Sequence, residues 1–204
     1  RTAPVIRAIR EAGLRLPISI DTRKAAVAEA ALDAGADIVN DVSAMTFDPD
    51  MARLVAEREV PICLMHSRGD PETMQNDPRY DDVLSDVLRS LSERVEAAKA
   101  AGIKEANIIV DPGIGFGKTV AHNLTLLRGL SALHDLGHPV LLGASRKRFI
   151  GTIGGAEVAA ERMPGSLAVA LQGIAQGAQI IRVHDVAETA QAFRLWLAMA
   201  TPEA

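Results

Sequence analysis

The sequence predicts an α/β protein built from parallel strands, and two observations predict it. Short runs rich in Ile, Val and Leu alternate with amphipathic helical stretches over the whole length, which is the pattern of repeated β/α units. The apolar runs lack polar alternation, as expected for parallel strands covered on both faces. Six such units would form either a small doubly wound sheet or most of an eight-stranded TIM-type (β/α)8 barrel.

The elements follow in order along the chain. Strands are expected over residues 17–20, 38–42, 60–65, 108–111, 140–144 and 180–184. The clearest helix carries apolar residues at helical spacing, namely Leu84, Leu88, Leu91, Val95 and Ala98. The other helices are expected over residues 4–12, 23–34, 49–58, 121–135, 166–176 and 187–199. A glycine follows several of these helices where a left-handed cap is expected, at Gly13, Gly35, Gly102, Gly137 and Gly177.

The start of the chain favours the barrel. The first helix has no preceding strand of its own. A barrel without its first two strands would begin in this way, so we expect about six β/α units and a natural N-terminus upstream of Arg1. Residues 1–204 form one domain in this interpretation, because no linker or low-complexity segment interrupts the repetition.

Composition excludes several classes of protein. The formal net charge of −4 does not suggest a non-specific nucleic-acid surface. The single cysteine, Cys63, lies in an apolar run, which predicts an inert core thiol and a reducing cytosol. No signal peptide and no apolar stretch long enough to span a bilayer is evident.

Polar side chains gather at the carboxyl ends of the predicted strands. In barrels and open α/β sheets this edge binds ligands. A single Asp there could merely cap a helix, but desolvating a whole ring of polar groups is unfavourable unless a polar ligand pairs with them. We therefore expect one shared cavity formed by Asp21, Asn40, Asp41, Met65, His66, Asp111, Ser145, Arg146, Lys147, Arg182 and His184.

These groups divide by their chemistry. Asp21, Asn40 and Asp111 could bind the edge of a heterocycle that carries N–H donors and ring acceptors. The cationic donors Lys147, Arg182 and His184 suit an anionic substituent. The predicted substrate therefore has a neutral ring at one end and an anion at the other. No Ser-His-Asp order or zinc-ligand spacing is evident, so catalysis by positioning and electrostatics is the better hypothesis.

Two segments near these strand ends carry glycine or basic residues. Residues 111–118 superficially resemble a phosphate loop, but Gly113, Gly115 and Gly117 alternate, so the P-loop spacing fails. Taken alone, the segment is also consistent with a plain glycine-rich turn. Residues 143–150 place three cations where a helix could begin, and a solvated basic patch is the alternative.

Taken together, the strand-end segments resemble the dihydropteroate synthase family. The resemblance runs from about residue 4 to 196 and rests on the order of 20–22, 39–42, 64–66, 111–118, 145–147 and 182–185. It implies an eight-stranded β/α-barrel that joins 4-aminobenzoate to 7,8-dihydropterin-6-ylmethyl diphosphate and releases diphosphate. Departure of diphosphate first would give a pterin cation that the arylamine attacks.

The resemblance also implies roles for individual residues. It places Asp21, Asn40, Asp111 and Lys147 on the pterin ring, with Met65, Phe116 and Gly143 lining the substrate site. Arg182 and His184 would hold the diphosphate, and Ser145, Lys147 and Arg148 would lie near 4-aminobenzoate. Lys147, Arg182 and His184 are the predicted catalytic residues.

The family pattern further implies Mg²⁺, a cytoplasmic location, a homodimer and two substrate loops. The expected Mg²⁺ ligand and both loops would lie upstream of Arg1, so we expect residues 1–204 alone to lack full activity and to expose unpaired strand edges. Two alternatives share the pterin slot: a methyltetrahydrofolate-binding methyltransferase domain and a non-catalytic pterin-binding remnant. The segment 145–147 and the loop ending at Lys118 favour the synthase.

Overall fold

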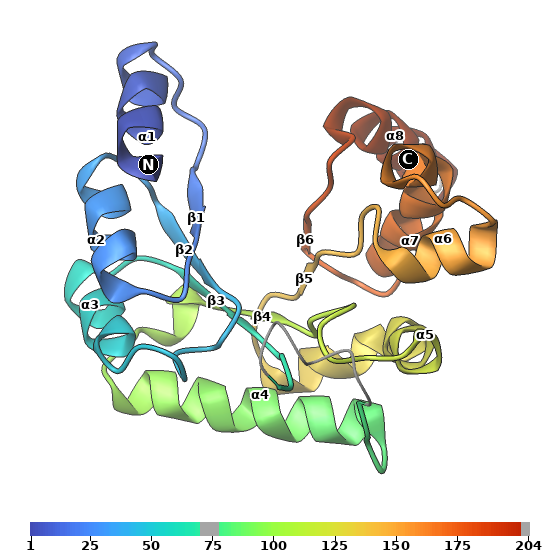
Figure 1. Cartoon of the computed structure of the whole chain (residues 1–204), viewed down its shortest axis with the longest axis horizontal. Helices are drawn as coiled ribbons and strands as arrows, with labels where there is room; N and C mark the ends of the chain where they lie inside the picture. The colour runs from blue at the N-terminus through green and yellow to red at the C-terminus, as the bar shows by residue number, and fades with distance from the viewer. Residues whose placement is uncertain (70–77, 201–204) are drawn as a thin grey trace.

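The computed structural model describes residues 1–69 and 78–200, and helices alternate with strands throughout (Figure 1). The strands are β1 Ser19–Asp21, β2 Ile38–Asp41, β3 Ile62–Met65, β4 Ile108–Asp111, β5 Leu141–Leu142 and β6 Ile180–Ile181. The α-helices are α1 Thr2–Glu11, α2 Ala25–Asp33, α3 Asp50–Arg58, α4 Val83–Ala100, α5 Val120–Arg128, α6 Arg148–Gly154, α7 Met163–Ala175 and α8 Val186–Ala200. Short 3₁₀ helices are η1 Glu105–Asn107, η2 Leu130–Leu136 and η3 Ala159–Arg162.

The strands pair in parallel with their neighbours in the sequence. The first four form a sheet in the order β1-β2-β3-β4, and β5 pairs with β6. A bridge between Val110 and Val140 joins the two sheets. A doubly wound sheet would reverse its strand order part-way, whereas this order never reverses, so the fold is that of the TIM-type barrel. Within the described residues β1 and β6 do not pair, and they lie on opposite sides of the opening in Figure 1.

The core has two layers because the strands are covered on both faces. Outward-facing residues such as Val39, Leu64 and Val110 pack with the helices in the larger cluster. Inward-facing Cys63, Ile109 and Leu141 form a second cluster inside the curved sheet. This double burial accounts for strands without polar alternation. Each strand also directs its last inward-facing side chain toward the carboxyl edge of the sheet.

The five glycines predicted to follow helices have positive φ, as expected for left-handed caps. The predicted strand starting at residue 60 begins at Ile62, and the last two strands, predicted over five residues, contain only two. The helix predicted over 121–135 is interrupted: α5 ends at Arg128, and a 3₁₀ helix follows Gly129. A Cβ on Gly129 would lie 2.7 Å from Leu84 Cδ2, so glycine allows α4 to approach at this break. Helix α6 begins inside the segment 143–150, which carries the three predicted cations.

Candidate active site

The ends of β1, β2 and β6 bring three of the predicted residues together. Asn40 Nδ2 donates to Asp21 Oδ2 over 3.2 Å. Arg182 Nη1 lies 3.7 Å from the same Asp21 oxygen, so the last strand contacts the first across the opening. The side chains of Arg182 and Asp21 are 48% and 57% exposed, so this ion pair faces solvent and contributes little to stability. The pair instead holds a cation beside a carboxylate at this edge of the sheet.

Asn40 has an unsatisfied acceptor in this arrangement. Its side chain is only 6% exposed, and its Oδ1 finds no hydrogen-bond donor among the residues that the structure describes. The amide orientation is fixed, because the Asp21 carboxylate accepts only from Nδ2. A buried unpaired carbonyl oxygen costs free energy, so it is suited to accept an N–H from a ligand.

A cavity of about 250 Å³ lies inside the curved sheet below these groups. Asp21, Asn40 and Arg182 lie toward the carboxyl edge, and apart from Ser19 the other lining residues are apolar, which suits a flat ring with one polar edge. Burial raises the pKa of the Cys63 thiol at its base well above the usual value, in keeping with an inert core residue. The lining residues are Ser19, Asp21, Ile38, Asn40, Cys63, Ile109, Leu141, Ile180, Ile181 and Arg182.

Asp111 ends β4 and is 3% exposed. Burial raises the pKa of its carboxyl group, while the charges of Lys147 and Arg182 and the bond from Gly113 oppose that rise. The backbone N–H of Gly113 donates to Asp111 Oδ1 over 2.7 Å. The carboxyl group is thus oriented at the start of the glycine-rich segment 111–118, called the glycine loop below. Two of the predicted cations are close enough to affect its titration.

Lys147 crosses to the glycine loop. Its Nζ donates to the carbonyl of Ile114 and lies 4.4 Å from the centre of the Phe116 ring, a cation–π contact. Burial lowers the pKa of Lys147 to about 8, although the charge of Asp111 acts in the opposite direction. A lysine in a cleft whose pKa is lowered toward neutral pH is typical of a functional site.

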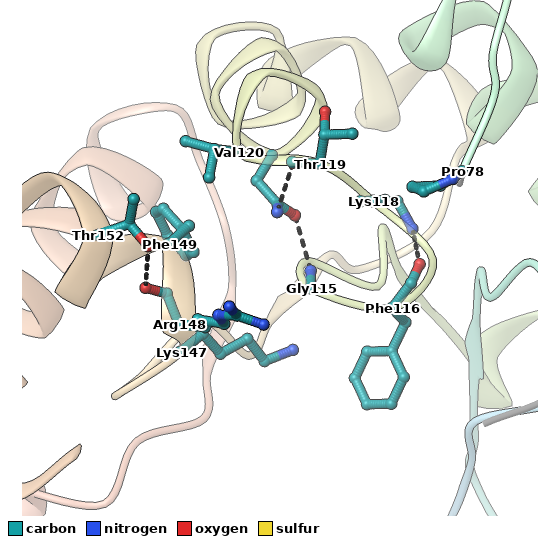
Figure 2. Close-up of a pocket in the computed structure, with 11 residues that line it drawn as sticks. Pro78, Gly115, Phe116, Lys118, Thr119, Val120, Lys147, Arg148, Phe149 and Thr152 are labelled. Atoms are coloured by element: carbon teal, nitrogen blue, oxygen red, sulfur yellow. Dashed lines mark hydrogen bonds between the residues drawn. The ribbon is translucent and has the colours of Figure 1, made fainter. Parts of the chain in front are cut away.

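Lys147 and Phe116 line a second cavity, of about 540 Å³, between the glycine loop, α5 and α6 (Figure 2). The close-up shows Arg148 and Lys147 together on one side and Phe116 on the other. The cavity therefore combines an aromatic face with two cations, which suits an aromatic anion. The other lining residues are Pro78, Gly115, Lys118, Thr119, Val120, Asn123, Phe149 and Thr152.

Two contacts join the loop after β5 to the segment after β6. Ser145 Oγ lies 3.0 Å from His184 Nδ1 and accepts from the His184 backbone N–H over 3.3 Å. Arg146, by contrast, forms a two-pronged ion pair with Asp185. The three predicted residues 145–147 therefore differ in their contacts: Ser145 contacts His184, Arg146 pairs with Asp185, and Lys147 lines the second cavity.

Gly143 gives the guanidinium of Arg182 its space. A Cβ at Gly143 would lie 3.1 Å from Arg182 Nε and 3.3 Å from Nη2. Met65, also predicted to line the site, is 2% exposed and lines neither cavity. It packs instead beneath the glycine loop, where its Cγ would lie 3.3 Å from a Cβ on Gly113.

Comparisons with known proteins identify the family of this chain. The family model for pterin binding enzymes matches residues 1–184. Dihydropteroate synthase from Neisseria meningitidis serogroup B is 46% identical over 203 residues, which are 98% of this chain and 70% of that protein. The chain belongs to the dihydropteroate synthase family.

Other members of the family extend the match. The Synechocystis synthase is 49% identical over 191 residues, covering 94% of this chain and 66% of the relative. The solved structure of Xanthomonas albilineans dihydropteroate synthase with 7,8-dihydropteroate superposes with a TM-score of 0.93 at 43% identity. It is matched over 100% of this chain and 74% of its own. The chain thus spans about two thirds of the length of these curated relatives.

Sequence reasoning assigned no role to two buried residues of this family member. Lys118 is 4% exposed, and its Nζ lies 3.0 Å from His66 Nδ1. Asn123, on α5, is 2% exposed and accepts from the Gly115 N–H over 2.7 Å. The available signal was Lys118 itself, because a lysine that closes a glycine-rich turn beside polar strand ends has nearby carbonyls to bind.

Proposed function

We propose that residues 1–204 form the main substrate-binding part of a dihydropteroate synthase, which joins 7,8-dihydropterin-6-ylmethyl diphosphate to 4-aminobenzoate and releases diphosphate. The observation that carries the proposal is the unpaired Oδ1 of Asn40 beside Asp21 at the opening of the interior cavity. A neutral heterocycle with adjacent N–H groups would satisfy both side chains. Relatives solved with 7,8-dihydropteroate and with 4-aminobenzoate support this choice of substrates.

The pterin ring fits the interior cavity. Asp21 accepts hydrogen bonds from the ring edge, Asn40 accepts a further N–H, and the apolar base contacts the ring face. The charges of Lys147 and Arg182 both act on the Asp111 carboxyl group. Asp111 lines neither cavity, so its contact with the ring stays a prediction.

The diphosphate lies beside the exposed guanidinium of Arg182, with His184 two residues further along. As the bond from the pterin methylene carbon to the diphosphate oxygen breaks, the electron pair leaves with the diphosphate, and the Arg182 guanidinium stabilises its growing charge. The arylamine nitrogen then bonds to the methylene carbon and loses one proton. No covalent bond to the protein is needed.

The arylamine fits the second cavity. Its ring packs against Phe116, and its carboxylate lies near Lys147 and Arg148. The two cavities share no lining residue, and Lys147 belongs to the second one, so the amine would approach the pterin methylene group from the Lys147 side. Binding alone would then supply most of the orientation that the reaction needs.

Mg²⁺, a homodimer and a cytoplasmic location complete the proposal. Among the described residues no group of three or more His, Cys, Asp or Glu side chains could hold a metal ion, and no step of the reaction is assigned to Mg²⁺. The described helices include none long and apolar enough to cross a membrane. Exposed Leu195, Leu197 and Met199 on α8 support association of two copies, which light scattering would test.

Calorimetry and product analysis test the function. We expect the full-length protein to bind the pterin diphosphate, to bind 4-aminobenzoate only when diphosphate and pterin are present, and to form dihydropteroate. Lys147→Met should abolish arylamine binding, whereas Lys104→Met, which alters an exposed lysine paired with Glu59, should leave it unchanged. Pterin binding without any arylamine binding in the unaltered protein would refute the synthase and favour a binding module.

A further inference from the structure

The buried amine of Lys118 connects parts of the chain that are far apart in sequence. Its Nζ donates to the carbonyls of Gly113 over 2.9 Å and Phe116 over 3.0 Å. It also lies 3.0 Å from His66 Nδ1 and 3.4 Å from the His66 carbonyl, at the end of β3. All four partners can accept a hydrogen bond, and an ammonium group has only donors.

The surroundings of Lys118 favour one arrangement of its hydrogen bonds. When Lys118 is an ammonium group it can only donate, so His66 Nδ1 then accepts and the imidazole proton lies on Nε2. Burial lowers the pKa of His66 to about 3, which keeps that ring neutral and able to accept. Burial also lowers the pKa of Lys118 to about 7, so the four acceptors must offset the desolvation of the charged form.

The loop held by Lys118 passes very close to its neighbours. A Cβ on Gly113, whose φ is +65°, would lie 1.8 Å from the His66 carbonyl oxygen. On the far side, Asn123 holds the Gly115 N–H. Held in this way, the loop places the Ile114 carbonyl and the Phe116 ring against Lys147.

We propose that Lys118 is a positioning residue for the arylamine site, acting through Phe116. It fixes the loop to the end of β3, so that the Phe116 ring and Lys147 bound the second cavity at the right separation. The inference rests on the proposed synthase function. Because neither Lys118 nor Phe116 lines the interior cavity, the pterin site is expected to be nearly independent of this tie.

Steady-state kinetics of the full-length protein separate the two substrates. We expect Lys118→Met to raise the KM for 4-aminobenzoate at least tenfold, while the KM for the pterin diphosphate changes less than threefold. Lys104→Met is the matched control and should change neither. Proportional changes in both KM values, or no change in either, would overturn the proposal.

A double-mutant cycle tests whether Lys118 acts through Phe116. If it does, adding Lys118→Met to Phe116→Ala should raise the arylamine KM by less than twofold beyond Phe116→Ala alone; multiplicative effects would overturn the proposal. Should Lys118→Met not fold, His66→Leu removes only one partner and should raise the same KM several-fold, and a null result there would also count against the idea. Absence of synthase activity in the unaltered protein refutes the proposed function instead.

Discussion

Two equally buried asparagines should respond oppositely to the same substitution. Asn40 is 6% exposed with an unpaired Oδ1, and Asn123 is 2% exposed with both amide atoms bonded. Replacing each by Leu removes a polar amide of the same kind from the same burial. Opposite changes in stability would therefore show that the unpaired oxygen of Asn40 destabilises the folded protein.

The magnitudes follow from the contacts. A buried unpaired acceptor costs about 1–3 kcal/mol, which Asn40→Leu recovers. It also loses the bond to Asp21, worth about 1.5 kcal/mol, the low end for a charged partner, because Asp21 is exposed enough to regain water. Leucine has as many side-chain heavy atoms as asparagine, so the substitution adds no packing contribution of its own. We expect an unchanged free energy of unfolding or a gain of up to about 1.5 kcal/mol.

Asn123→Leu should behave in the opposite way. It loses the bonds to Gly115 and Thr119, at 2.7 and 2.8 Å, and removes an acceptor from a loop amide. The free energy of unfolding should fall by about 2–3 kcal/mol. Urea denaturation of both full-length variants measures these changes, and calorimetry with the pterin diphosphate should show at least tenfold weaker binding for Asn40→Leu. Equal losses of stability in the two variants would refute the reasoning.

Three further perturbations test the charged groups. Asp111→Asn should lower the pKa of Lys147 below about 8, since the carboxylate charge raises it; amine titration by NMR would detect this, and an unchanged pKa would contradict it. The lowered pKa of Lys147 means that the unfolded chain holds more protons than the folded one between about pH 8 and 10.5. Its contribution to stability therefore rises with pH in that window, by about 1.4 kcal/mol per unit at most, and Lys147→Met should flatten the slope in urea titrations. Gly143→Ala should displace the Arg182 guanidinium and weaken diphosphate binding several-fold with little change in thermal unfolding, and undiminished binding would argue against Arg182 as the diphosphate ligand.

The fold was largely predictable because its signals are local. Apolar runs without alternation, capping glycines and helical periodicity all arise within single elements. The residues at the strand ends could also be predicted, because parallel strands direct their carboxyl ends to one edge. The break at Gly129 was missed, since it depends on the approach of Leu84 from another helix. The nearby carbonyls of Gly113 and Phe116 could have indicated Lys118, whereas its contact with His66, 52 residues away, could not be predicted.

The stagger between neighbouring strands explains how Arg182 meets Asp21, which the sequence alone could not predict. Along the pairing, Asp21 is in register with Asn40, Asn40 with Cys63, and Cys63 with Ile109. In β5 and β6 the same row falls well before Arg182, because Val110 pairs with Val140 and Leu142 with Ile181. On a flat sheet Arg182 would therefore lie beyond the level of Asp21, at about 3.3 Å per residue of offset. The observed 3.7 Å contact requires strands that tilt and curve as in a barrel, so the curvature itself assembles the site.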